Sequence, residues 1–274
     1  MSLFRAQEWW SWTLQQHSRH DSAPQSKDEV DGTAGALVVA NIDNDPSGKM
    51  KIIAGSLSGM LRMFSPRGGP RGGHTVEDMV IETDLHLPIL QLLSGRFIAG
   101  TRDNFLAVLH PYSLAVYAIS PVKSTESSST TTVAAYYDLQ QIHVHKFARP
   151  AYNMVSGTFG ADRTSASSSD ALCVQSLDGV LQFYINGAFA FHRLLPQTSF
   201  IIPGPLLYLP STDSFITVNS EMVMESYRYS LIASSSDNVD IDPTLMTGKR
   251  LTAEWKANLG DHITWLGAAR HEGG

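Results

Sequence analysis

The 274-residue chain has little cysteine, no excess of positive charge and no long apolar run. Its single cysteine, Cys173, cannot form an internal disulfide, and the opening MSLFRAQEWW carries charges where a secretory signal would be apolar. A formal net charge of -6 does not favour binding to phosphate backbones. The longest apolar stretches, 36–40 and 201–209, are shorter than the roughly 20 residues of a membrane helix. We therefore expect a cytoplasmic protein that binds no nucleic acid and whose association with membranes would come through surface contacts or partners.

Motifs for catalysis are also missing. In GSLSG, residues 55–59, leucine stands where the nucleophile elbow of a hydrolase has serine. GRFIAGT, residues 95–101, resembles half of a phosphate-binding loop but lacks the lysine before threonine and a following helix, so we interpret it as a strand turn. We expect no enzyme activity, no catalytic or cofactor-binding residues, no cofactor and no small-molecule substrate.

A repeated thirteen-residue pattern is the main positive signal. Each copy has a short apolar arm with β-branched residues, a turn, and a second arm that ends on an aromatic residue, which predicts a β-hairpin. In two copies the turn contains Ser58-Gly59 or Asp178-Gly179, where glycine supplies a positive φ. The four copies are IIAGSLSGMLRMF from Ile52, FLAVLHPYSLAVY from Phe105, LCVQSLDGVLQFY from Leu172, and FITVNSEMVMESY from Phe215.

Further strands flank these hairpins. Apolar strands are expected before them at 36–42, 89–93 and 206–209, and alternating strands after them at 76–85, 135–145, 187–194 and 249–259. Four strands per unit form the blade of a β-propeller. The sequence thus predicts an all-β, WD40-like propeller, with the hairpins as the inner-to-middle strands of successive blades.

The repeats start 53, 67 and 43 residues apart, and the first two intervals exceed the roughly 40 to 50 residues of a propeller blade. Polar inserts at 67–73, 124–132 and 164–169 account for the excess, because Gly-rich and Ser/Thr-rich segments bury too little apolar surface to fold and are typical of loops. We interpret residues 1–274 as one incomplete propeller domain with these inserts.

The count of blades and the two ends of the chain give two further expectations. The chain holds four units, and 263–268 is expected to begin a fifth, so we favour a piece of a longer, seven-bladed ring over an atypical closed ring of four. At the other end, AQEWWSW, which includes Trp9, Trp10 and Trp12, echoes TAEWKAN from Thr252. This echo predicts a strand there, of the kind that completes the last blade and packs in the core, although aromatic residues also mark membrane and protein contacts.

Several segments match one known family in order along nearly the whole chain. They are SLFRAQEWWS, ANIDN, KIIAGSLSGMLRMFSP, SLDGVLQFY, AFHRLLP, IIPGPLLY, TDSFITVNS, VMESYRY and GKRLTAEWKANLGD. In these strings the chain resembles the N-terminal domain of the Bardet-Biedl syndrome nine (parathyroid-hormone-responsive) family. The resemblance implies a non-catalytic scaffold of the BBSome, a coat-like complex that carries membrane cargo in cilia and flagella. It also implies other propeller and helical-repeat BBSome subunits as partners, and a location in the cytoplasm, cilium and ciliary base.

The alternative function is a calcium-dependent adhesion propeller. Residues 41–48, NIDNDPSG, place oxygen side chains such as Asp43 and Asp45 at alternating positions, as calcium loops do. The same residues are common turn formers, the other predicted blades lack this loop, and no acidic residue closes it. We therefore favour a polar hairpin turn and expect no metal.

Two other candidate sites are weaker. His143 and His145 have the spacing of ligands on one face of a strand, but zinc needs about four ligands and Cys173 is remote in sequence. We favour strand histidines. The RGGPRGG insert at 67–73 has only two arginines and no interleaved aromatic residues, so a solvated loop is favoured over RNA binding. The partner-binding residues stay unknown at this stage.

Overall fold

The computed structural model describes most of the chain between residues 32 and 268. The described residues are 10, 32–33, 35–66, 78–122, 136–160, 169–196, 202–234 and 251–268. The inserts predicted at 67–73 and 124–132, and all but residue 169 of the third, lie outside these ranges. In the part of the chain that the structure describes, there are sixteen strands and one short helix.

The strands form four antiparallel sheets of four strands each, which we call blades one to four. Blade one contains β1 (Leu37–Ala40), β2 (Lys51–Gly55), β3 (Met60–Phe64) and β4 (Met79–Asp84). Blade two contains β5 (Gln91–Gly95), β6 (Phe105–His110), β7 (Ser113–Val122) and β8 (Tyr136–Lys146). Blade three contains β9 (Ala151–Gly157), β10 (Ala171–Ser176), β11 (Val180–Ile185) and β12 (Ala188–Leu194). Blade four contains β13 (Leu206–Leu209), β14 (Ser214–Val218), β15 (Val223–Arg228) and β16 (Trp255–Asn258). The predicted all-β propeller architecture is confirmed.

The four predicted hairpins are the second and third strands of the four blades. In blades one, three and four, the first residue of the repeat pairs with its closing aromatic residue, as in Ile52 with Phe64. Blade two pairs Leu106 with Tyr117 instead, because its turn has only two residues between His110 and Ser113. Gly59 and Gly179 have the predicted positive φ, of 97° and 83°.

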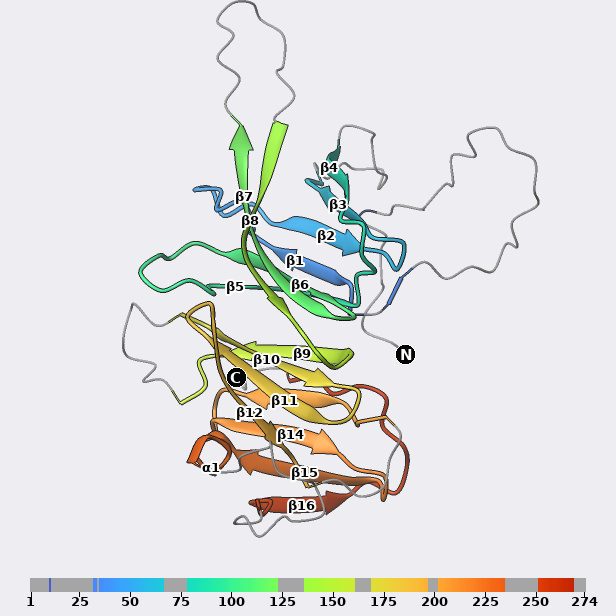
Figure 1. The fold of residues 1–274 in the computed structure, drawn as a ribbon. Helices are drawn as coiled ribbons and strands as arrows, with labels where there is room; N and C mark the ends of the chain where they lie inside the picture. Colours follow the sequence, from blue (N-terminus) through green and yellow to red (C-terminus); the bar gives the residue numbers. More distant parts are fainter. Residues whose placement is uncertain are drawn as a thin grey trace, which may run out of the picture.

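The blades are stacked side by side as an open arc, with blade one and blade four at its two ends (Figure 1). The first strands lie next to one another along the inner side of the arc, in the order β1, β5, β9 and β13. The fourth strands form the outer rim. All four middle hairpins turn at the right-hand side of Figure 1, so their turns share one face of the arc.

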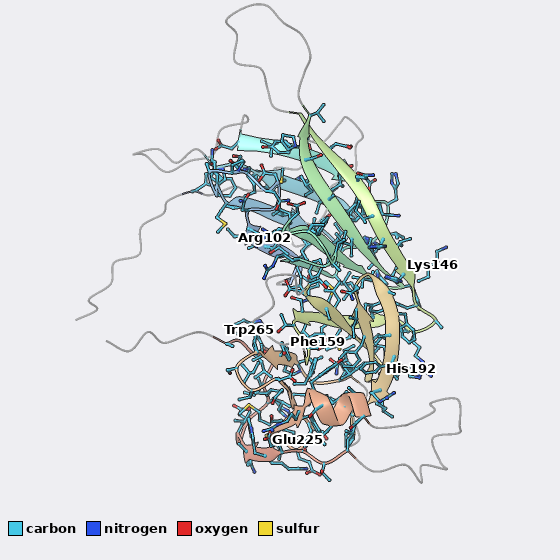
Figure 2. The ribbon with its side chains drawn as sticks, turned by 90° about the vertical axis from the view of Figure 1, so that its left-hand side faces the viewer. Arg102, Lys146, Phe159, His192, Glu225 and Trp265 are labelled. Carbon is cyan, nitrogen blue, oxygen red and sulfur yellow. The ribbon has the colours of Figure 1, made fainter. Side chains whose placement is uncertain are left out.

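Each pair of neighbouring blades encloses its own apolar core. Ile53, Leu61 and Met63 of blade one pack with Leu92, Leu106 and other residues of blade two, and a second cluster joins blades two and three. The third cluster, between blades three and four, is rich in aromatic rings. Phe159 lies 4.7 Å from Tyr208, 5.0 Å from Phe215 and 5.8 Å from Phe183 between ring centroids. Figure 2 shows Phe159 between the two blades.

Three local expectations need correction. Residues 263–268 are not a strand; they return to the inner side of the arc, where a first strand would lie, but pair with none of the described sheets. A short helix, α1 (Tyr229–Ser234), follows β15 and was not predicted, because six residues carry too little periodicity to be recognised. The inner strand of blade three, β9, was also missed, because its polar Asn153 and exposed Tyr152 interrupt the apolar pattern.

The predicted N-terminal strand lies outside the described residues except for Trp10. The ring of Trp10 packs 5.3 Å from that of Phe64, and its Nε1 donates a hydrogen bond of 3.3 Å to Asp78. Both partners belong to blade one. The expected place of this segment in the last blade therefore stays a prediction.

Candidate interaction surfaces

The face that carries the middle-hairpin turns is held in shape by polar side chains within each turn. The Ser56 hydroxyl accepts a 2.9 Å hydrogen bond from the amide of Met60. Ser176, at the same place in blade three, donates 3.1 Å to the carbonyl of Val180. In blade four, the side-chain oxygen of Asn219 accepts a hydrogen bond of 3.1 Å from the amide of Val223. We call this surface the turn face; it comprises the described residues of 56–59, 84–90, 111–112, 147–150, 177–179, 195–205, 219–222 and 259–262.

Backbone hydrogen bonds join each turn to the segments that connect the blades. The amide of Ile89 donates to the carbonyl of Ser56 at 3.0 Å, and the amide of Leu259 to Met222 at 2.9 Å. The connection 147–150 is hydrogen-bonded at both ends. The amide of Phe147 donates to the carbonyl of Tyr112, and the amide of Leu177 donates to the carbonyl of Pro150, each at 2.8 Å. These hydrogen bonds preorganise the turns and the described connections that they join.

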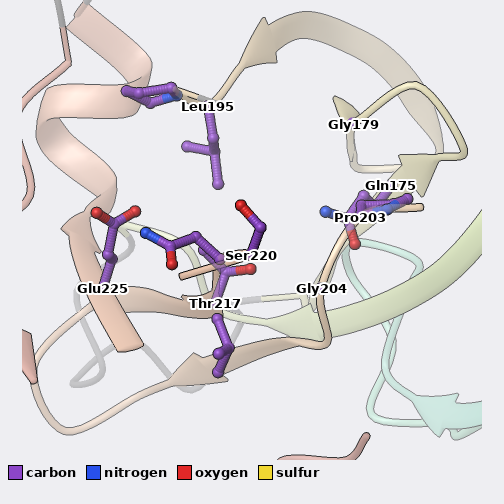
Figure 3. A pocket seen from close by; sticks show the side chains of 11 residues that line it. Gln175, Gly179, Leu195, Pro203, Gly204, Thr217, Ser220 and Glu225 are labelled. Carbon is purple, nitrogen blue, oxygen red and sulfur yellow. The ribbon is translucent and has the colours of Figure 1, made fainter. Parts of the chain in front are cut away.

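A small polar pocket opens on the turn face between blades three and four (Figure 3). Glu225 is buried there, with Lys256 Nζ 2.5 Å from Oε1 and the Tyr227 hydroxyl donating to Oε2 at 2.8 Å. Across the pocket, Gln175 is 3% exposed and its Oε1 has no partner. The pocket volume of about 50 Å³ suits ordered water, which would satisfy Gln175, better than a substrate.

A larger cavity of about 630 Å³ lies on the inner side of the arc. It is lined by the first strands of blades two to four and by residues 264–266, with Trp265 at its mouth 76% exposed. The side-chain amide of Gln91 bridges blades two and three there. It donates a hydrogen bond of 2.7 Å to the carbonyl of Met154 and accepts one of 2.6 Å from the backbone amide of Met154. Figure 2 shows Trp265 on this inner side and His192 on the outer rim. None of the described residues that line this cavity is charged.

The loop proposed as a calcium site is built as a turn around a lysine. Lys51 is 2% exposed and its Nζ lies 2.9 Å from Asp43 Oδ2 and 4.0 Å from Asp45 Oδ2. Asp45 Oδ1 accepts both the amide and the hydroxyl of Ser47 at 2.9 Å, which lowers the pKa of this carboxyl group. Asn41 closes the turn through hydrogen bonds to the backbone of Asp45. The ammonium group of Lys51 thus occupies the place that a cation would take, which favours the polar-turn interpretation.

The two strand histidines pack between blades two and three. The rings of His143 and His145 stack at 6.4 Å, and His145 lies 4.6 Å from Tyr184. Burial lowers the pKa of His145, partly opposed by a hydrogen bond to the backbone of Gly187. Cys173 is fully buried in the core between blades three and four, and burial raises the pKa of its thiol. In the described ranges, no three His, Cys, Asp or Glu side chains come together as metal ligands would.

The two glycine-containing motifs are turns. Gly95 ends β5, and the backbone amide of the following Arg96 donates a hydrogen bond of 2.9 Å to the carboxylate of Asp170. This amide is therefore not free to bind a phosphate. In GSLSG, Leu57 stands at the tip of the β2–β3 turn and is 38% exposed. The RGGPRGG segment at 67–73, with Trp9 and Trp12, lies outside the described residues. Of the helices that are described, none is long and apolar enough to cross a membrane.

Comparison with known proteins decides the family. A family model described as "PTHB1 N-terminal" matches residues 1–273. The chain belongs to the PTHB1 N-terminal family. Protein PTHB1 of Homo sapiens is 39% identical over 267 residues, covering 95% of this chain and 27% of that protein. Protein PTHB1 of Xenopus laevis is 38% identical over 266 residues, with 95% and 29% coverage. The chain thus spans less than a third of the length of these PTHB1 relatives.

Among solved structures, two of BBS1N in complex with ARL6DN, soaked with mercury or with lead, cover 85% of the chain. Their TM-scores are 0.39 and 0.40, at 12% identity, over 68% and 69% of the solved chain. The family-level resemblance found in the sequence is confirmed by the PTHB1 matches.

The surface residues of the turn face were not predicted from the sequence. A signal for them was present, because Leu57 and Leu177 occupy the same position of the repeat, at turn tips where Gly, Asn, Asp or Ser is usual.

Proposed function

We propose that this chain is a non-catalytic scaffold module of the BBSome that acts in ciliary and flagellar membrane-protein trafficking. Its partners are other propeller and helical-repeat subunits of that complex, and its membrane association is indirect. It works in the cytoplasm, at the ciliary base and in the cilium.

The observation that carries this proposal is the match to the PTHB1 N-terminal family along residues 1–273. The architecture supports it. Three separate inter-blade cores and the hydrogen-bonded turn face make a rigid arc with two broad faces and an outer rim. Rigid propeller surfaces of this kind suit simultaneous contact with several protein partners, because little conformational entropy is lost on binding.

Affinity purification of the tagged chain from ciliated cells tests the proposal. We expect quantitative mass spectrometry to recover other BBSome subunits well above an untagged control. A matched pair of variants separates folding from binding. Leu61→Asp places a charge in the core between blades one and two and should abolish recovery, whereas Lys49→Ala, at an exposed site outside that core, should not. Failure of the folded wild-type chain to recover any BBSome subunit would refute the proposal.

A further inference from the structure

Large apolar side chains project from the turn face at the turns and connections of all four blades. Three of them, Leu57, Tyr112 and Leu177, stand at the tips of the turns in blades one, two and three and are 38%, 58% and 38% exposed. The others belong to connections between blades or follow the last strand: Leu87 is 47% exposed, Ile202 53% and Leu259 37%. We call these six residues the apolar series.

Contacts within the turn face place the members of the series near one another. The backbone of Leu87 approaches the β2–β3 turn so closely that a Cβ on Gly59 would lie 3.2 Å from its amide and carbonyl. Tyr112 and Leu177 are bonded through their backbones to the two ends of the same connection, 147–150. These contacts join the turn of Leu57 with Leu87, and Tyr112 with Leu177, while Ile202 and Leu259 belong to the part of the turn face at blade four.

The turns themselves do not require exposed apolar side chains at these tips. Polar residues and glycine form such turns equally well, and in blades one and three the hydrogen bonds of Ser56 and Ser176 already fix the turn backbone. Exposed apolar groups that are repeated on one rigid face are typical of protein contact surfaces.

The charge of the turn face indicates what kind of partner fits. Its exposed carboxylates are Asp84, Asp178, Glu221 and Asp261. The cations described on or beside it are Arg149, paired with Asp178, Lys256, paired with the buried Glu225, and Lys146 at the end of β8. A hydrogen bond from the amide of His86 lowers the pKa of Asp84 and keeps it ionised. An acidic surface attracts cationic groups and repels anionic lipid headgroups.

We propose that the turn face is a docking surface for a protein segment that carries apolar side chains flanked by lysine or arginine. The partner is another subunit of the same complex, so this inference rests on the proposed function. The apolar series supplies the buried contacts, and the carboxylates around it select the positive partner and speed its association.

The test compares three chains in the purification described above. The face variant is Leu57→Ser, Tyr112→Ser, Leu177→Ser. The matched control is Val144→Ser, Phe189→Ser, Leu231→Ser, which removes three side chains of similar exposure, 48%, 51% and 45%, away from the turn face. Both should melt within about 2 °C of the wild type, because exposed substitutions away from special features change stability little.

We expect the face variant to lose recovery of at least one subunit by roughly tenfold, a loss of about 1.4 kcal/mol of binding free energy, while the control keeps it. The charge variant Asp84→Lys, Glu221→Lys, Asp261→Lys should show the same loss, and the wild-type interaction should weaken as salt rises. Carbene footprinting of the purified complex should show protection of Tyr112 and Leu177.

Other outcomes would overturn the inference. Equal recovery by the face variant and the wild type would show that the turn face binds no subunit, while leaving the proposed function intact. Equal losses in the face variant and the control would indicate non-specific apolar contact. Recovery of no subunit by the wild type would refute the proposed function itself. Sedimentation showing a wild-type dimer that the face variant lacks would assign the face to a second copy of the chain. Binding of the wild type, but not the face variant, to phosphatidylserine vesicles would assign it to a membrane.

Discussion

At the scale of single residues, buried polar side chains connect neighbouring blades. Asp43 and Lys51 of blade one form an ion pair with side-chain exposures of 3% and 2%, and Tyr137 of blade two donates a 3.2 Å hydrogen bond to the same carboxylate. Burial, with the negative charge of Asp43, raises the pKa of Tyr137 to about 12, so this hydroxyl remains a donor at neutral pH. The group is the structural explanation of the loop that resembled a calcium site.

Removal of the ammonium group alone should destabilise the protein. In Lys51→Met the buried carboxylate of Asp43 keeps only the Tyr137 hydroxyl, and such unpaired buried charges cost about 3–5 kcal/mol. Urea denaturation should show this loss, whereas Lys49→Met, at an exposed lysine two residues away, should cost almost nothing. The double variant Asp43→Leu, Lys51→Met should recover much of the lost stability, because it leaves no unpaired buried charge. Addition of millimolar calcium to the wild type should not raise Tm; a rise that Asp43→Ala abolishes would support the adhesion alternative instead.

A second residue-scale prediction concerns acid stability. His110 is 2% exposed and its Nδ1 lies 2.9 Å from the Pro88 carbonyl. Burial lowers the pKa of His110 below its ordinary 6.5, although the hydrogen bonds to carbonyls oppose this. Below about pH 6.5 the unfolded chain therefore takes up a proton that the folded chain does not, so stability falls as pH falls.

The comparison of melting curves between pH 7.5 and pH 5.5 checks this prediction. His110→Asn keeps an N–H donor for Pro88 but does not titrate, so its Tm should fall less over this range than that of the wild type. His86→Asn, at a histidine whose side chain is 83% exposed, serves as the control and should retain the wild-type fall. Identical pH profiles for His110→Asn and the wild type would contradict the assigned cause.

At the scale of elements, much of the fold could be predicted because local rules decide it. Alternation and turn residues located all four hairpins and the outer strands that follow them, since both are set by neighbouring residues in the sequence. Segments whose conformation depends on distant partners could not be predicted. Residues 263–268 have an apolar strand pattern but find no sheet edge to pair with, and β9 is defined by its pairing with β10 rather than by its own mixed composition.

The candidate surfaces were harder to predict than the strands for the same reason. The oxygen spacing of residues 41–48 suggested calcium, and the observation that decides against it is the position of Lys51, which only the folded β1–β2 hairpin brings to Asp43. Likewise, Leu57, Tyr112 and Leu177 share one face because the blades stack in the same orientation (Figure 1). Neither the contact of Lys51 with Asp43 nor the shared face of the three turn residues can be recognised in the linear sequence.

The close packing of first strands gives an element-scale prediction. Gly157 at the end of β9 faces Tyr208 of β13, and a Cβ there would lie 2.3 Å from the tyrosine ring. The ring is fixed by its hydroxyl, which donates 2.8 Å to Asp213. Gly157→Ala should therefore force blades three and four apart locally and cost about 1–3 kcal/mol. Gly32→Ala, with its nearest atom 3.9 Å away, should be nearly neutral; similar denaturation midpoints for the two variants would contradict the packing described.

At the scale of the whole molecule, the described residues place no neighbouring blade on the outer side of blade one. Side chains alternate across a strand, so Leu37 and Val39 of β1 point away from blade two, whereas Val38 packs against the core between the two blades. Leu37 is 59% exposed and Val39 58%. Propeller blades normally bury both faces against neighbours, so this apolar side is a place where chains would associate.

Serine substitutions on the two sides of β1 test this arrangement. In the 274-residue chain, Leu37→Ser with Val39→Ser should leave Tm nearly unchanged and reduce light scattering on heating, because these side chains contribute little buried area. Val38→Ser, on the same strand, should lower stability by about 1–3 kcal/mol, since it removes apolar contacts from the core.

In a longer chain, extended into the sequence that the PTHB1 relatives carry beyond the matched region, we propose that a further blade covers this side. The longer chain should then melt higher and scatter less, and the Leu37 and Val39 substitutions should become as costly as Val38→Ser. An unchanged cost in the longer chain would show that the outer side of blade one stays open.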